Sequence, residues 1–347
     1  DVTIYVLVDE SGKNEDLDKT LTRMDELSGH VKVEYVNPLA NPKFYYNYTQ
    51  TQPADNSMII VCGDRSTVVE YSNIYTYEMN YNTYSYEASG YDGEGQIVSA
   101  MAYVTTQDIP KFYIVAGHGE LAFEESFLNA IKKENAVYEE LALYAAEEIP
   151  EDAKGIIINA PTSDFSKEDA DKVISYLERG GNALIVPTVV DVEMTNFNRI
   201  LDYYGVSVVD GVIVEEDRER YYQNPYYLFP EIASDETTEN VINGAIFAPF
   251  SRGLSYDDMA GDVYYTPLLI TSESSFSKVG VTNGEDYSRQ EGDIEGPFAV
   301  CLRAEKDTED GETSSAFLVA SESLFTDTAD DMVPGNNEKL FSSMIRA

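Results

Sequence analysis

The stretch from residue 155 to residue 187 constrains the fold of this chain more than any other. It opens with the apolar run GIIINAP (155–161) and closes with a second one, NALIVP (182–187). Between the two runs, Ser166 and Asp169 form a helix-capping pattern and Gly180-Gly181 forms a helix stop. The positions that recur at helical spacing are apolar: Ala170, Val173, Ile174 and Leu177. Two buried strands joined by an amphipathic helix predict a parallel sheet covered by helices.

The same alternation continues on both sides of this stretch. KFYIVAG (111–117) reads as a buried strand, and VSVVDGVIVEE (206–216) reads as extended chain. PFAVCLRAE (297–305) and SSAFLVAS (314–321) flank a polar turn and predict a hairpin. The helices expected between these strands carry apolar faces: Phe123, Phe127, Ala130 and Ile131 in one, and Phe197, Ile200, Leu201 and Tyr204 in the other. We therefore predict a doubly wound α/β domain over 109–347, with a C-terminal β hairpin and an irregular insertion rich in Tyr and acidic residues at about 217–297.

The first 108 residues predict a smaller α/β unit. Two β-rich segments, 2–8 and 31–36, flank a helix expected at 15–27, where Leu17, Leu21, Met24 and Leu27 share one face. Segments 57–62 and 67–72 predict a hairpin, and 95–106 predicts a helix that leads out of the unit. At 347 residues the chain fits about two domains.

The charge balance excludes several classes of function. The chain has 23 Lys+Arg against 63 Asp+Glu, a net charge of −40. Such a surface repels phosphate backbones and anionic lipid headgroups, so neither nucleic-acid binding nor electrostatic membrane docking is expected. Neutral or cationic solutes and basic protein surfaces remain as partners, although acidity by itself mainly favours solubility.

Cysteine and histidine are too scarce for most metal or redox sites. Cys62 and Cys301 lie in apolar runs and are expected to be buried free thiols, with a single disulfide left open. Because His30 and His118 are the only histidines, a His-rich metal centre is excluded. Three acidic groups could bind calcium, but none has EF-hand spacing: Asp92/Glu94, Asp257/Asp258/Asp262 and Asp327/Asp330/Asp331. We predict no metal and no cofactor.

A short loop, Gly117-His118-Gly119-Glu120, is the first candidate site. It ends a predicted strand and opens a helix, the place where open α/β sheets bind ligands. We expect Glu120 in the first turn of that helix and the His118 ring towards the carboxyl edge of the sheet, so that His118→Ala folds almost as well as the parent. The loop then binds a ligand or partner; the alternative is a plain strand–helix turn. Since no Ser or Cys stands at a nucleophile elbow, we predict no catalytic residue, and an enzyme built on His118 and Glu120 is the rival hypothesis.

Tyrosine provides the second candidate site. The chain has 27 Tyr and no Trp, and four tyrosines fall in a stretch of weak periodicity: Tyr221, Tyr222, Tyr226 and Tyr227. Aromatic rings in loops are typical of carbohydrate-binding surfaces, which makes these residues a candidate aromatic surface. The alternative is that they fill half-exposed strand faces.

Several stretches, in this order, resemble the family of ABC-transporter auxiliary proteins related to the gliding-motility component GldG. The run GEGQIVSAMAYVTTQDIPKFYIVAGHGE (93–120) resembles the helix, linker, strand and GHGE signature of that family. The run 149–187 is similar to its proline, helix, double-glycine and strand core, and 201–216 to the segment that follows. YVNPLANPKF (35–44) resembles the N-terminal turn of that family, with Asn37 in place of the usual Asp. The segments 266–274 and 314–341 of this chain resemble the family's C-terminal part.

The resemblance implies a thioredoxin-like N-terminal unit without a redox CxxC, followed by a domain similar to class I glutamine amidotransferases. It also implies flanking transmembrane helices, partner ABC permease and ATPase subunits, and a place on the extracytoplasmic face of a bacterial membrane. A chain that starts at Asp1 without Met fits a soluble piece of such an anchored protein. The expected function is a non-enzymatic auxiliary component that binds a partner or solute. Gly117, His118, Gly119 and Glu120 are signature positions without an assigned role.

Overall fold

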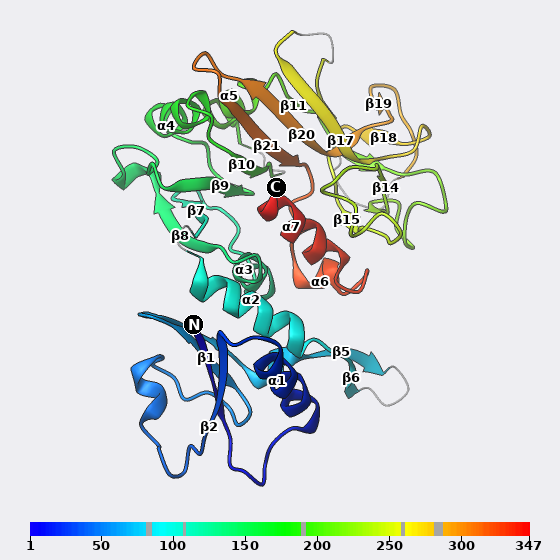
Figure 1. The fold of residues 1–347 in the computed structure, drawn as a ribbon. Coiled ribbons are helices and arrows are strands. Elements are labelled where there is room, and N and C mark those ends of the chain that lie inside the picture. Colours follow the sequence, from blue (N-terminus) through cyan, green and yellow to red (C-terminus); the bar gives the residue numbers. More distant parts are fainter. Residues whose placement is uncertain (81–84, 107–108, 189–191, 258–260, 281–286) are drawn as a thin grey trace. The chain divides into compact units, whose positions relative to one another are not determined.

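The chain is a mixed α/β protein that divides into two compact units, Asp1–Ile109 and Pro110–Ala347 (Figure 1). The computed structural model describes residues 1–80, 85–106, 109–188, 192–257, 261–280 and 287–347. Among these residues, none of the helices combines the length and apolar character needed to cross a membrane.

Unit 1 is a small sheet covered on one face by two helices. Its elements are β1 (Val2–Leu7), α1 (Glu15–Leu27), β2 (Val31–Val36), η1 (Phe44–Asn47), β3 (Met58–Cys62), β4 (Arg65–Val69), η2 (Tyr71–Ile74), β5 (Tyr75–Asn80), β6 (Ser85–Tyr91) and α2 (Gly93–Thr105). The sheet order is β2-β1-β3-β4, with β1 parallel to β2 and the other pairs antiparallel, while β5 and β6 form a separate hairpin. The predicted α1 helix and the β3–β4 hairpin are confirmed.

The core of unit 1 follows from the alternation of β1. Ile4 and Val6 point to the helical face, where Leu17 and Leu21 of α1 and Ile97 of α2 share one buried cluster with them. On the other face, the ring of Tyr5 lies 5.0 Å from that of Phe44 in η1. Asn14 caps the start of α1, because its side chain accepts from the backbone N–H of Leu17.

Unit 2 contains the larger sheet. Its elements are β7 (Lys111–Ala116), α3 (Glu125–Lys133), β8 (Val137–Ala142), η3 (Leu143–Ala145), β9 (Ala153–Asn159), α4 (Lys167–Glu178), β10 (Ala183–Val186), α5 (Thr195–Asp202), β11 (Ser207–Val208), β12 (Val212–Val214), β13 (Tyr227–Leu228), β14 (Glu231–Ile232), β15 (Ala248–Pro249), β16 (Leu254–Ser255), β17 (Val263–Ile270), β18 (Phe276–Lys278), β19 (Ile294–Glu295), β20 (Ala299–Asp307), β21 (Thr313–Val319), α6 (Asp327–Asp330) and α7 (Asn336–Arg346). The order β11-β16-β20-β21-β10-β9-β7-β8 runs across the sheet, and β17 lies beside β20.

The centre of this sheet is parallel. β8, β7, β9, β10 and β21 pair in parallel, whereas β20 is antiparallel to β21. The predicted parallel strands at 111–116, 155–160 and 182–187 are therefore confirmed, as is the hairpin of β20 and β21. Counted in chain order from β7, the parallel strands lie in the order 2-1-3-4-5, one of the doubly wound orders.

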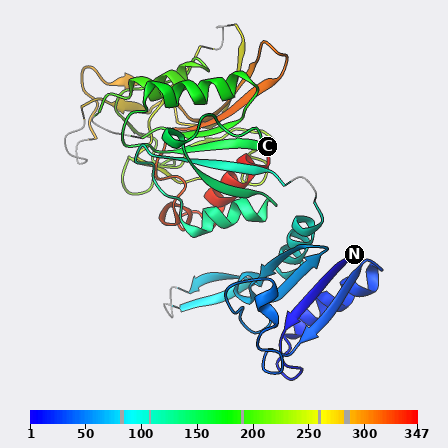
Figure 2. The ribbon, with the colours of Figure 1, turned by 90° about the vertical axis from the view of Figure 1, so that its left-hand side faces the viewer.

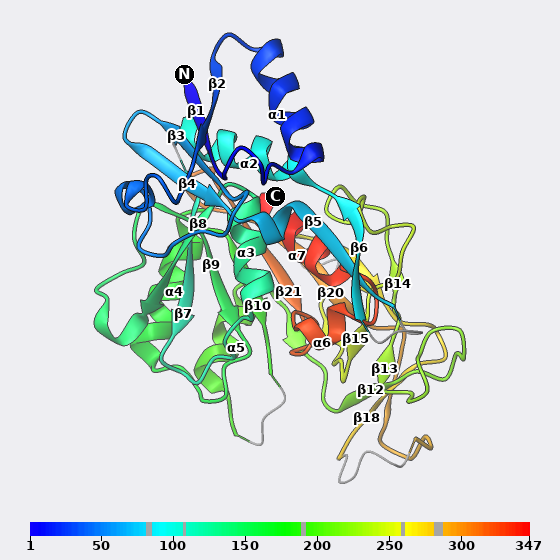
Figure 3. The same ribbon diagram turned by 90° about the horizontal axis from the view of Figure 1, so that it is seen from below.

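Helices cover both faces of this sheet, as Figure 2 shows. Because side chains alternate along a strand, Ile156 and Ile158 of β9 pack under α4 and α5, while Ile157 faces the cluster that contains α3 and α7. Figure 3 shows α3 and α7 side by side, and their Phe127 and Phe341 rings lie 5.4 Å apart. The capping pattern of α4 is confirmed, since Ser166 Oγ accepts from the N–H of Asp169 at 3.0 Å.

Two details of the sequence prediction are wrong. The predicted extended segment 206–216 is broken into β11 and β12, with Gly211 between them at φ +91°. The predicted irregular insertion at 217–297 holds the short strands β13 to β16, but it also contains β17, eight residues long and paired with β20 in the main sheet. Only the second half of this strand stands out in the sequence, as the apolar run TPLLIT (266–271), whereas its start is rich in tyrosine.

Candidate functional site

The candidate loop Gly117–Glu120 lies where the strand order of unit 2 reverses. β7 has β8 on one side and β9 on the other, and the chain leaves β7 for α3 and leaves β9 for α4. In an open α/β sheet, ligands bind at the carboxyl ends of the two strands that flank such a reversal. The loop after β7 and the loop after β9 (160–166) therefore form the expected ligand edge. We call this place the switch point.

A histidine side chain fills the switch point. His118 Nδ1 lies 3.0 Å from Glu120 Oε1, and its Nε2 lies 3.3 Å from Asp169 Oδ2, on α4. The imidazole also stacks on Phe165, with ring centroids 3.8 Å apart and an interplanar angle of 7°. The side chains of His118, Glu120 and Asp169 are only 7%, 6% and 6% exposed. The ring is held on both edges and on one face.

A lysine completes the cluster and balances its charge. Lys172 Nζ lies 3.1 Å from Asp169 Oδ1 and donates to the carbonyl oxygen of Leu143 at 2.6 Å. Ser166 Oγ donates to Asp169 Oδ2 at 2.9 Å. With His118 protonated, two carboxylates face two cations, so each buried charge has an opposite partner. We call Glu120, His118, Asp169 and Lys172 the switch-point cluster.

The pKa directions agree with an ionised cluster. Burial disfavours the charged imidazole, but hydrogen bonds and charges from Glu120 and Asp169 outweigh it, so the pKa of His118 lies above its ordinary value. Burial likewise opposes ionisation of Glu120, yet His118 and a backbone N–H hold the pKa of that carboxyl below its usual range. The pKa of Asp169 is also lowered, because Lys172, Ser166 and His118 outweigh its burial.

Two glycines let the loop close around this cluster. Gly117 has φ +120° and Gly119 has φ +74°, values that side chains disfavour. A Cβ atom on Gly119 would lie 2.2 Å from Thr162 Oγ1. The loop after β9 is hydrogen-bonded to the same turn, since the N–H groups of Thr162 and Ser163 both donate to the carbonyl oxygen of His118. The glycines of the motif are thus explained by backbone geometry.

The sequence-based placement of Glu120 is wrong. We expected Glu120 in the first turn of the helix after β7, but α3 begins only at Glu125. Glu120 instead turns back and accepts from the backbone N–H of His118 at 2.8 Å. His118 is a buried ring with a hydrogen bond at each of its two nitrogens. We therefore expect His118→Ala to be less stable than the parent, in contrast to the expectation from the sequence.

The cluster is not arranged for nucleophilic catalysis. Both ring nitrogens of His118 are engaged by carboxylates, so neither is left to accept a proton from a hydroxyl or thiol. A hydroxyl of the loop after β9, Ser163 Oγ, donates to the carbonyl oxygen of His118 at 2.9 Å and not to its ring. The geometry therefore supports a structural clamp with a polar, closed surface.

The four candidate tyrosines do not form one exposed surface. Tyr226 is buried in a small cluster with Val214 and Phe276, and its ring stacks on Phe250. Tyr227 packs edge-on against Phe247 and Phe250, Tyr221 is partly buried, and Tyr222 is exposed. The predicted aromatic surface is wrong for Tyr226, because this loop region buries rings in a core of its own.

Both cysteines are free thiols, but the prediction that both are buried is wrong for Cys62, which is partly exposed. Cys301 is buried, which raises the pKa of its thiol. Within the described ranges, no group of three or more His, Cys, Asp or Glu side chains is placed to hold a metal ion. Asp258 of the predicted acidic group at 257–262 lies outside those ranges.

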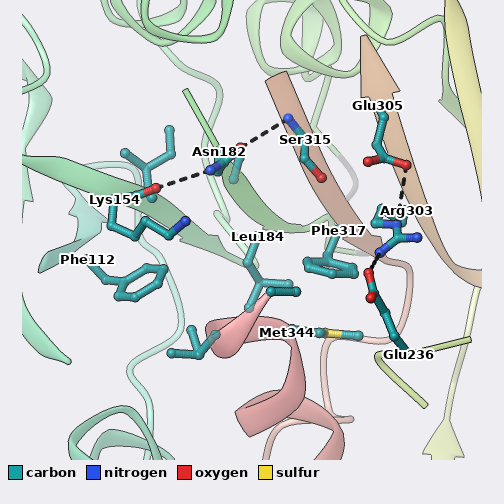
Figure 4. Close-up of a pocket in the computed structure, with 15 residues that line it drawn as sticks. Phe112, Lys154, Asn182, Leu184, Glu236, Arg303, Glu305, Ser315, Phe317 and Met344 are labelled. Atoms are coloured by element: carbon teal, nitrogen blue, oxygen red, sulfur yellow. Dashed lines mark hydrogen bonds and ion pairs between the residues drawn. The ribbon is translucent and has the colours of Figure 1, made fainter. Parts of the chain in front are cut away.

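A small cavity of about 160 Å³ opens at the other edge of the sheet, by the amino ends of β9, β10 and β21 (Figure 4). Leu184, Phe317 and Met344 form its apolar part. Its arginine, Arg303, is already paired with Asp235 at 3.1 Å and with Glu236 at 3.0 Å. Because two carboxylates already pair with Arg303, this arginine has little to offer an anionic ligand.

Sequence reasoning missed three members of the site: Asp169, Lys172 and Phe165. Asp169 was recognised only as part of a helix cap, because its contact with His118 joins two segments that only the folded sheet brings together. Phe165 carried no signal, because a ring stacked on imidazole has no sequence pattern.

Comparisons with known proteins place the chain in no family. No family model matches it, and no curated protein matches it. Among solved structures it is similar to the mmIFT52 N-terminal domain, with 15% identity, 66% of this chain and 92% of that chain covered, and a TM-score of 0.46. It is also similar to a putative ThuA-like protein from Bacteroides uniformis, at 14% identity, 68% and 92% coverage and TM-score 0.37. A third is a putative GMP synthase component from Thermoplasma acidophilum, at 10% identity, 69% and 96% coverage and TM-score 0.33. At these values the similarities say nothing about function.

Proposed function

We propose that this chain is a non-enzymatic, extracytoplasmic auxiliary component of an ABC-type system, of the kind related to the gliding-motility component GldG. One observation carries the non-enzymatic part: the ligand edge of the sheet is filled by the switch-point cluster, whose imidazole has both nitrogens engaged. The ABC-type part rests on the motif order, from the GHGE signature to the double-glycine helix. The proposed partners are ABC permease and ATPase subunits, at the outer face of a bacterial membrane.

The finer fold belongs to the same proposal. Unit 1 pairs a parallel β1–α1–β2 unit with an antiparallel hairpin and a second helix on the same face, which supports a thioredoxin-like unit. Unit 2 has parallel strands in the order 2-1-3-4-5 with helices on both faces, which supports an amidotransferase-like domain that lacks the nucleophile.

The partner surface is proposed beside the closed loop. Tyr144, after β8, and Leu121, directly after Glu120, both expose large apolar side chains, and the Tyr144 ring lies against Gly117. Exposed aromatic and aliphatic side chains beside a rigid loop are typical anchors of protein–protein contacts. An acidic surface around them favours a partner with basic residues at its rim.

Co-purification from the native membrane tests this function. The full-length protein should bring down a permease and an ATPase, and Tyr144→Ala combined with Leu121→Asp should remove both. Tyr264→Ala, which changes another exposed tyrosine of unit 2, is the matched control and should retain them. Failure to recover any ABC-type component argues against the proposal. So does amide or ester hydrolysis that Ser163→Ala abolishes in a folded protein.

A further inference from the structure

A second, larger cavity lies at the same carboxyl edge of the sheet, after β10. Its volume is about 440 Å³, within the range of small-molecule sites. The apolar part of its wall comes from α5 and the chain before and after it: Met194, Phe197, Leu201 and Val208. Its polar part includes Thr188, just after β10, and Arg252, just before β16.

Arg252 carries a largely buried positive charge whose carboxylate partner is distant. Its side chain is 19% exposed, its Nη2 and Nε donate to the carbonyl oxygen of Val209 at 2.9 and 3.2 Å, and its Nη1 donates to that of Thr188 at 3.5 Å. The carboxylate paired with it, Asp210, stands 4.0 Å away and is 85% exposed, so water screens that charge. In the same unit, Arg199 meets Asp171 at 2.6 Å and Arg303 meets Glu236 at 3.0 Å.

The backbone donors at the start of α5 are already used. The N–H groups of Asn196 and Phe197, in the first turn of that helix, both donate to the carboxylate of Asp164 at distances of 2.9–3.1 Å. An anionic group that enters the cavity therefore finds its donor in Arg252 and not in the helix end.

The rest of the cavity wall favours positive charge. Three carboxylates line it together with the Arg252 guanidinium: Glu193, Asp202 and Asp210. A ligand that carries only negative charge meets Arg252 but is repelled by this excess of carboxylates. A ligand with one carboxylate and one ammonium group satisfies both signs, and an apolar body fits against Met194, Phe197 and Leu201.

We propose that this cavity binds a small zwitterion with an apolar body, of the amino-acid class, with its carboxylate on Arg252 and its ammonium group towards the carboxylates of the wall. The site is independent of the proposed function, because it requires no ABC partner and lies apart from the switch-point cluster in its lining residues.

Calorimetric titration of the 347-residue chain near neutral pH tests the charge pattern with three probes of one shape. They are L-leucine, 4-methylpentanoate, which lacks the ammonium group, and 3-methylbutylamine, which lacks the carboxylate. Leucine should bind, and each analogue should bind at least about tenfold more weakly, since each loses one charge-assisted contact. Absence of leucine binding below about 10 mM overturns the proposal. If either analogue binds as tightly as leucine, the ligand does not need both charges, which overturns the proposal of a zwitterion.

Two variants locate the binding. Arg252→Gln should weaken leucine binding about tenfold or more, while Arg289→Gln, an arginine bound to Glu216 and Glu295 on the surface, should not change it. Asn198→Trp fills the cavity from an exposed position of α5 and should abolish binding even if Arg252→Gln does not fold. Leucine binding that survives Asn198→Trp in a folded protein overturns the assignment to this cavity.

Discussion

The switch point and the cavity beside Arg252 lie at the same edge of one sheet, but their charges are paired differently. At the switch point, His118 and Lys172 neutralise Glu120 and Asp169 in a buried cluster closed by Phe165. At the cavity, Arg252 stands 4.0 Å from an exposed carboxylate and beside open volume. In a doubly wound sheet, the usual ligand-binding position can therefore be filled by buried side chains of the protein, while a cavity stays open beside the next strand. The difference predicts that mutations at the first place affect stability and that mutations at the second affect binding.

The largest effect is expected from His118→Ala. Removal of the imidazolium leaves the buried Glu120 carboxylate without its cation and Asp169 with Lys172 alone, so unit 2 should lose about 3–5 kcal/mol of stability. Denaturant unfolding followed by circular dichroism measures the loss, and hydrogen exchange locates it to β7, β9 and α4. His30→Ala is the matched control, because that histidine is exposed and should change stability by less than about 0.5 kcal/mol. Equal stability of the two variants breaks the comparison.

A smaller loss is expected from Gly119→Ala. The substitution places a Cβ atom at φ +74° and 2.2 Å from Thr162 Oγ1, which should cost about 1–3 kcal/mol. Gly63→Ala provides the control in unit 1, since Gly63 has φ +60° but nothing within 4 Å of its Cβ position. If thermal unfolding shows the same loss of stability for both variants, the contact with Thr162 adds no cost, which means that the loop can shift away from Thr162.

The pH dependence of stability sharpens the comparison further. The pKa of His118 is raised in the folded protein, so its contribution is complete below its unfolded pKa of about 6.5 and is lost as pH rises through the higher folded value. The pKa values of Glu120 and Asp169 are lowered, so their contributions are present above about pH 4 and are lost as pH falls through the folded values. The stability difference between the parent and His118→Ala should therefore be greatest between about pH 4.5 and 6.5.

NMR titration of the His118 ring checks the cause. Asp169→Asn removes one of the two carboxylates at the ring and should lower the pKa of His118 relative to the parent. An unchanged His118 titration in that variant means that the Asp169 contact does not hold the charge.

The smallest effect is expected at the open cavity. Asn198 lines it from an exposed position on α5, so Asn198→Ala should change the free energy of unfolding by less than about 0.5 kcal/mol. Thermal unfolding beside the His118→Ala variant measures the contrast. A loss above about 1 kcal/mol indicates that the cavity wall is as tightly packed as the switch point.

Much of the fold was predictable because its signals are local. The apolar runs at β7, β9 and β10 exceed what a half-exposed strand carries, and Ser166 with Gly180 marks both ends of α4. β17 was visible only through its apolar half, TPLLI, because it is an antiparallel strand with one partly exposed face. The site was predictable only in part: the loop at 117–120 was found, but Glu120 was placed on a helix that starts five residues later.

The sequence by itself determined the parallel sheet, the helix that follows β9 and the position of the GHGE loop at the end of a strand, because strand and helix periods and glycine stops act over a few residues. Only the tertiary structure decided that Asp169 meets His118 across 51 residues and that Phe165 closes the ring. It also decided that Tyr226 is buried and that Arg252 faces a cavity with its carboxylate partner 4.0 Å away. The physical reason is that burial and charge pairing depend on which strands become neighbours. That order, here β10-β9-β7-β8, emerges from packing of the whole sheet and not from any single segment.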